Sequence, residues 1–65
     1  MEMFDVLEVN IQSKRVRILA RNLDEPNAEA VVNMAVARRG VEEHFFVSAP
    51  LGMYNDGDTW KEAGA

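Results

Sequence analysis

The chain has 65 residues, of which 48% are hydrophobic and 28% charged, and its formal net charge is -4 at pH 7. This length leaves room for one small domain, and the hydrophobic content is too high for a wholly disordered chain. Without cysteine there is no disulfide framework and no thiolate metal site. No apolar run approaches the ~20 residues of a membrane span, and the acidic start lacks the basic segment of a secretory signal. We therefore expect a cytoplasmic protein with no membrane segment.

The N-terminal third of the chain predicts two strands joined by a short polar turn. From Phe4 to Ile11, apolar side chains occur on both faces, which is typical of a strand inside a sheet. A polar connection of hairpin length follows, and the second strand runs from about Arg15 to Leu23. Regular alternation places one apolar set on one face, namely Val16, Ile18 and Ala20, and the remaining side chains on the other, namely Arg15, Arg17, Leu19, Arg21 and Leu23.

A helix is predicted from about Glu25 to Arg39. Asp24 is suited to cap its first turn, since a carboxylate accepts a hydrogen bond from a free amide there. Gly40 is suited to end it in a left-handed conformation, and acidic and basic residues lie at the ends that the helix dipole favours. The apolar positions follow helical spacing and predict the face that packs on a sheet: Ala28, Val31, Val32, Ala35 and Val36.

A third strand is predicted from Glu42 to Ala49 and is ended by Pro50. Phe45 and Val47 lie on one face of this strand, and the other face carries His44, Phe46 and Ser48. We therefore expect an α+β fold of ββαβ order over residues 1–50, with one helix packed on one face of a three-stranded antiparallel or mixed sheet. Residues 51–65 form an aromatic C-terminal arm or an extra turn or strand. The first strand is expected at the centre, in the order 2-1-3 in preference to 1-2-3, because it is apolar on both faces.

One helix covers only one face of such a sheet, so the other face needs a different cover. We expect this second face to hold a mixture of Phe4, Val6, Leu19, Arg17, Arg21 and Phe46. The aromatic arm, with Tyr54 and Trp60, can fold back on its own sheet or dock on another copy, and the sequence leaves both arrangements open.

Catalysis and metal binding have little support in the sequence. There is one histidine and no cysteine, and His44 lies between Glu43 and two phenylalanines on a predicted strand. Asp56-Gly57-Asp58 resembles part of a calcium loop but lacks the distal glutamate of such loops, so we interpret it as a turn. We predict no catalytic residues, no metal ligands, no cofactor and no enzyme activity.

Two binding functions remain. Arg17, Arg21 and Phe46 on an open sheet face have the chemistry of a platform for single-stranded nucleic acid. The net charge of -4 argues against it, because phosphate contacts dominate the affinity for nucleic acid.

Protein–protein interaction is the function that the sequence favours. A chain of this size buries only about 60% of its unfolded surface, and self-association is a usual remedy. We predict a homodimer that also binds a second protein, with an aromatic and apolar interface and a basic rim. The predicted interface residues are Phe4, Leu19, Phe46, Tyr54 and Trp60, with Arg17 and Arg21 at the rim.

Several stretches of the chain resemble a known group of proteins. The resemblance is carried by Ala20-Arg21-Asn22-Leu23, Asn27-Ala28-Glu29-Ala30, Met34-Ala35-Val36-Ala37-Arg38-Arg39-Gly40-Val41-Glu42, Phe45-Phe46-Val47 and the ending Tyr54-Asn55-Asp56-Gly57-Asp58-Thr59-Trp60. In these stretches the chain is similar to short uncharacterised proteins of tailed phages and prophages. The resemblance implies a phage-encoded accessory protein that acts in the host cytoplasm and has a host or phage protein as its second partner, and it implies no activity.

Overall fold

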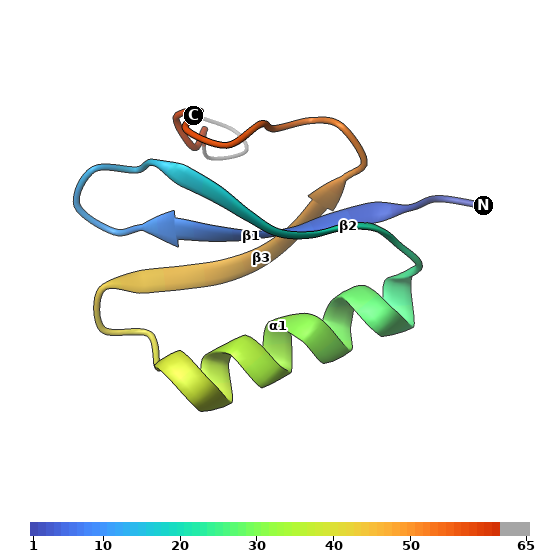
Figure 1. The fold of residues 1–65 in the computed structure, drawn as a ribbon, viewed down its shortest axis with the longest axis horizontal. Helices are drawn as coiled ribbons and strands as arrows, with labels where there is room; N and C mark the ends of the chain where they lie inside the picture. Colours follow the sequence, from blue (N-terminus) through green and yellow to red (C-terminus); the bar gives the residue numbers. More distant parts are fainter. Residues whose placement is uncertain (62–65) are drawn as a thin grey trace.

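The computed structural model describes residues 1–61. The last part of the predicted arm, residues 62–65, lies outside the described residues. Figure 1 shows the elements in chain order: β1 (Phe4–Asn10), β2 (Val16–Leu23), α1 (Glu25–Arg39) and β3 (His44–Pro50). The α+β fold of ββαβ order is therefore confirmed.

The three strands form one antiparallel sheet in the order β2-β1-β3. The predicted arrangement 2-1-3 is thus confirmed, with β1 at the centre. Its position follows from its composition, because Val6 faces one side of the sheet and Leu7 and Val9 face the other, and all three side chains are fully buried.

The helix has the predicted ends. The Asp24 carboxylate accepts a hydrogen bond from the Asn27 amide at 3.0 Å, and Pro26 lies in the first turn, where no N–H is needed. At the other end Gly40 has a φ of 71° and its N–H donates to the Val36 carbonyl at 2.9 Å. Only Ala28 of the helix is buried, so the helix packs on the sheet along a narrow line.

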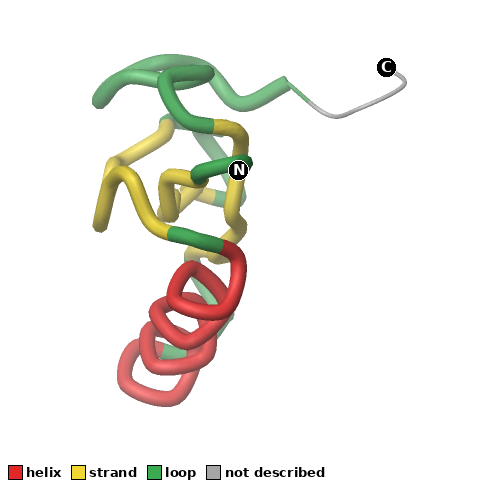
Figure 2. The backbone as a smooth tube through the Cα atoms, turned by 90° about the vertical axis from the view of Figure 1, so that its right-hand side faces the viewer, coloured by secondary structure: helices red, strands yellow, loops and turns green. Residues whose placement is uncertain are grey.

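The structure has three layers: α1, the sheet, and the segment that follows β3 (Figure 2). The helix covers the face that carries Glu8 and Phe46, since these residues lie opposite each other on β1 and β3 and Glu8 is bonded to Arg39 of α1. Val6 shares this face. Phe4 shares it by alternation along β1, and Arg17 shares it because it lies opposite Glu8. The expectation that Phe4, Val6, Arg17 and Phe46 lie on the face opposite the helix is therefore wrong.

The opposite face is covered by the chain itself. Tyr54 is buried against Leu7, Val9, Val16 and Ala49, and Trp60 packs on this cluster. The Trp60 ring is stacked on Tyr54 with centroids 5.4 Å apart and meets the edge of Phe45 at 5.6 Å. We call residues 51–61 the C-terminal segment. Of the two arrangements that the sequence leaves open, the structure therefore has the one in cis, and no second molecule is needed to cover this face.

A bulge in β2 changes the predicted alternation. Leu7 lies opposite Ile18 and Val6 opposite Ala20, so Leu19 is an extra residue on the α1 side of the sheet. The bulge reverses the faces of Ala20 and Arg21, and a second irregularity between Val6 and Phe4 returns Leu23, opposite Phe4, to the α1 side. Leu19 was expected on the face opposite the helix, and this expectation is wrong. Arg21 was predicted to share a face with Arg17, but it lies on the face of the C-terminal segment, where it bonds Asp5.

Within residues 1–61, no helix has the length and hydropathy to cross a membrane.

Candidate protein interaction surface

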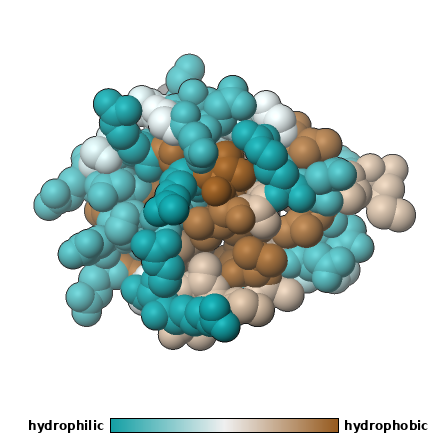
Figure 3. Space-filling model, in the orientation of Figure 1, coloured by the Kyte–Doolittle hydropathy of each residue, from teal (hydrophilic) through white to brown (hydrophobic). Residues whose placement is uncertain are grey.

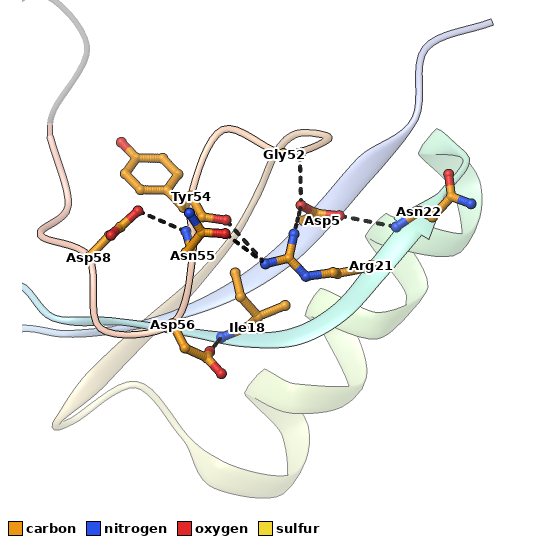
Figure 4. A network of polar contacts seen from close by, with 9 residues as sticks. All are labelled: Asp5, Ile18, Arg21, Asn22, Gly52, Tyr54, Asn55, Asp56 and Asp58. Carbon is orange, nitrogen blue, oxygen red and sulfur yellow. Dashed lines mark hydrogen bonds and ion pairs between the residues drawn. The ribbon is translucent and has the colours of Figure 1, made fainter.

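A buried polar network holds the C-terminal segment to the sheet (Figure 4). The Asp5 carboxylate, 1% exposed, accepts hydrogen bonds from Arg21 Nη1 at 3.0 Å, from the Asn22 amide at 3.1 Å and from the Gly52 amide at 3.0 Å. Arg21 Nη2 also donates to the Tyr54 carbonyl at 3.3 Å. Each contact joins segments that are distant in the sequence, so Asp5 and Arg21 serve to hold the fold together.

A second charged group lies between the sheet and α1. The buried carboxylate of Glu8 forms an ion pair with Arg39 at the end of the helix. His44, half-buried at the start of β3, has its Nε2 3.6 Å from the other oxygen of Glu8. The group therefore ties the end of α1 to β1 and β3 across one face of the sheet.

The outer edge of β2 is closed by the C-terminal segment. The Val16 amide donates to Asp58 at 2.8 Å and the Val16 carbonyl accepts from Gly57 at 2.8 Å. The Ile18 amide donates to the Asp56 carboxylate at 2.6 Å. Asp56-Gly57-Asp58 is the turn that brings these groups to the strand. Since the bulge distorts the strand beyond Ile18, β2 offers little regular edge to another chain.

Beside this edge lies an apolar surface that we call the β2 patch. It consists of half-buried residues on β2 and on the neighbouring side of α1, namely Leu19, Ala20, Leu23, Val31 and Ala35. They stay half-exposed because α1 packs mainly on β1 and β3 and only loosely on β2. Figure 3 shows hydrophobic residues gathered over β2 and the adjoining side of α1, with hydrophilic residues around them. A surface of this kind is typical of protein interaction sites.

The outer edge of β3 is open. The Ile11 amide donates to Glu43 at 3.0 Å and the Leu51 amide to Met3 at 3.0 Å, and the register between them is regular. The odd-numbered residues of β3 therefore bond β1, and the N–H and C=O groups of the even-numbered ones point away from the sheet. Among the described residues, no hydrogen-bond partner is found for these groups of His44, Phe46 and Ser48.

The helix borders this open edge. A shallow depression between α1 and β3 is lined by Glu25, Glu29 and Val32 on the helix side and by Phe46 on the strand side. Val36 follows Val32 at helical spacing and is 38% exposed. We call this row of α1, Glu25, Glu29, Val32 and Val36, the β3-side stripe.

The predicted interface residues do not form one surface. Tyr54 and Trp60 pack in the core of their own chain, and Phe46 is buried beneath α1. Leu19 belongs to the β2 patch, and Phe4 is half-buried at the other end of the sheet from the hairpin turn. Arg17 is exposed on the outer strand, whereas Arg21 is bonded to Asp5.

The predicted nucleic-acid platform is not assembled. Arg17 and Arg21 lie on opposite faces of β2, Phe46 is under the helix, and the C-terminal segment covers the other face of the sheet. Over residues 1–61, no three acidic or histidine side chains are grouped as metal ligands would be.

Sequence reasoning missed the roles of Asp5 and Glu8. Both are acids within the most apolar strand of the chain, and Asp is depleted in strands. An acid at a buried strand position implies a partner, because an unpaired buried charge is too costly. That signal could have indicated buried ion pairs, although it could not have identified Arg21 and Arg39 as the partners. No protein-family model, curated protein sequence or solved structure matched the chain.

Proposed function

We propose that the chain is a small non-catalytic protein–protein interaction module. It self-associates, and it binds a second protein through the β2 patch. The observation that carries the proposal is this patch of half-exposed Leu and Val side chains beside a closed strand edge. Exposed Arg17, from the same strand, supplies a basic group at its rim. An apolar centre with a polar rim is the usual anatomy of a protein interface.

The setting of this function comes from the sequence resemblance alone. A phage or prophage accessory protein acting in the host cytoplasm would take a host or phage protein as its second partner. Binding through a few large apolar side chains needs no cofactor, and the proposal includes none.

Two measurements test the proposal. The first is the mass in solution by light scattering at micromolar to millimolar concentration, where a mass that stays at 7.3 kDa contradicts self-association. The second is affinity capture of a bacterial partner by the wild-type chain, by Leu19→Lys and by the control Met53→Lys. We expect Leu19→Lys to lose the captured protein and Met53→Lys, on an exposed residue of the C-terminal segment, to retain it. Equal capture by all three chains would contradict a role for the β2 patch.

A further inference from the structure

We propose that the open edge of β3 pairs antiparallel with the β3 edge of a second copy, about a two-fold axis at Phe46, to form a six-stranded sheet. This inference rests on the self-association proposed above and assigns a surface and a register to it. It is independent of the β2 patch, because β2 and β3 are the opposite outer strands of the sheet.

The backbone of β3 is self-complementary. Its outward residues, His44, Phe46 and Ser48, are evenly spaced about Phe46. Antiparallel pairing centred there places Phe46 opposite Phe46 of the second copy and His44 opposite Ser48 of that copy. In this register every outward N–H and C=O group of the three residues has a partner. A shift of the register by two residues would leave some of them unpaired.

The side chains of β3 do not protect its edge. Natural edge strands are protected by charged residues, proline, bulges or a covering segment. From His44 to Ala49 the strand has no Lys, Arg, Asp, Glu or Pro, Pro50 occupies only its last position, and its pairing with β1 has no irregularity. The β2 edge has both a covering segment and a bulge. The fold thus protects one edge and leaves the other suited to pairing.

The β3 side chains on the face of the C-terminal segment are also compatible with this two-fold axis. Phe45 and Val47 are half-buried there, and both pack on the cluster around Leu7. The two-fold axis places Phe45 opposite Val47 of the second copy, in the closer type of antiparallel pair, where an aromatic ring and a β-branched side chain stabilise each other. Pairing would therefore cover apolar surface that one copy leaves exposed.

The helix face fits as well. The axis places the two α1 helices side by side and antiparallel, with their β3-side stripes facing each other. Val32 then lies near Val32 of the second copy, and the exposed Val36 lies near the second copy's Glu29. Glu25 faces the Arg39 end of the second helix, where the arginine side chain is 46% exposed although it bonds Glu8. The opposite charges at the two helix ends favour the antiparallel arrangement.

A proline substitution tests the surface. Ser48→Pro removes one outward N–H, and proline is tolerated in an edge strand when its missing N–H would face away from the sheet. Ser48→Ala is the matched control, because it removes the hydroxyl and keeps the N–H. We expect the wild type and Ser48→Ala to have twice the chain mass of 7.3 kDa at high micromolar concentration in sedimentation equilibrium. The dissociation constant of the Ser48→Pro dimer should be at least ~10-fold higher, since this variant loses backbone hydrogen bonds on both sides of the axis.

Cysteine pairs test the register, and the chain has no cysteine to interfere. Opposite residues of a hydrogen-bonded pair have Cα atoms about 5.5 Å apart, which a disulfide can span. An equimolar mixture of His44→Cys and Ser48→Cys chains should therefore form a disulfide dimer on mild oxidation. Either chain alone should not, because identical positions lie about 13 Å apart along the strands in this register. Rapid crosslinking of Ser48→Cys alone would contradict the register.

The outcomes separate this inference from the proposed function. A wild type that stays monomeric contradicts β3 pairing and the proposed self-association, whereas binding of a second protein through the β2 patch is tested separately by the capture experiment. A dimeric wild type whose mass is unchanged by Ser48→Pro contradicts β3 pairing and leaves self-association in place. If Leu19→Lys dissociates that dimer, the β2 patch is the dimer surface. If Ser48→Pro is monomeric, its circular dichroism must match that of Ser48→Ala, and the cysteine mixture gives a second readout that does not depend on proline.

Discussion

The Arg21 guanidinium lies 3.0 Å from the Asp5 carboxylate, and this ion pair joins the outer strand β2 to the central strand β1. Asp5 is buried, whereas Arg21 is exposed along part of its length. The same carboxylate accepts a hydrogen bond from the amide of Gly52, at the start of the C-terminal segment. One acid thus fixes both the distorted end of β2 and the segment that covers the sheet.

Substitution of Asp5 should therefore destabilise the whole fold. Asp5→Asn keeps the size of the side chain but removes the charge that Arg21 and two backbone amides use. We expect a loss of about 2–4 kcal/mol in the free energy of unfolding, measured by urea denaturation. Such a loss is most of the stability of a domain of this size. Glu2→Gln, at an exposed acid just before the same strand, should change the midpoint little. Equal midpoints for both variants would contradict a structural role for Asp5.

The closed edge of β2 gives a local prediction. The Ile18 amide donates to the Asp56 carboxylate, whereas the neighbouring Val16 amide donates to the Asp58 carbonyl. In Asp56→Ala, the exchange of the Ile18 amide with solvent should become faster by at least ~10-fold, while Val16 keeps its protection. The measurement is residue-resolved hydrogen exchange by NMR. Unchanged exchange at Ile18 would show that Asp56 does not close this edge.

The β3-side stripe of α1 gives a prediction about self-association. Val36→Glu should weaken the dimer at least ~10-fold, because it sets a carboxylate near Glu29 of the second copy. Val36→Lys should weaken it less, since its charge is opposite to that of Glu29. The control is Met34→Glu, at a residue that is 53% exposed and lies on a different side of the helix. Sedimentation equilibrium gives the three dissociation constants. An equal loss in Met34→Glu would contradict the placement of the two helices.

The elements with strong local signals could be predicted from the sequence. Asp24 and Gly40 cap the helix as expected, because caps depend on residues a few positions apart. The central position of β1 followed from its apolar residues on both faces, and with it the strand order.

The path of β2 could not be predicted in the same way. Alternation assumes a regular strand, whereas the bulge at Leu19 depends on what the strand pairs with. It turns Arg21 toward Asp5, which is 16 residues earlier in the chain. Asn22, with a φ of 61°, completes the distortion, and Asn tolerates this left-handed conformation better than most residues. Contacts of this kind decide faces that the local pattern leaves undetermined.

The position of the C-terminal segment was also left undetermined. Its aromatic residues indicated that it packs on apolar surface, and both cis and trans packing satisfied that requirement. The choice depends on long-range contacts, such as the Asp5–Gly52 bond and the pairing of residues 57–60 with residues 14–16. Because the segment covers its own sheet in cis, a bare sheet face no longer supports dimer formation. The open edge of β3 is the feature that supports it.

Amide exchange along β3 tests that open edge most directly. The amides of Phe45 and Val47 bond β1 in every state of the chain, whereas those of Phe46 and Ser48 are bonded only when a second copy pairs with the edge. In NMR hydrogen exchange at low micromolar and at millimolar concentration, we expect Phe46 and Ser48 to gain protection with concentration while Phe45 and Val47 change little. Exchange at Phe46 and Ser48 that stays fast and independent of concentration, in a sample whose mass shows a dimer, would contradict pairing through β3.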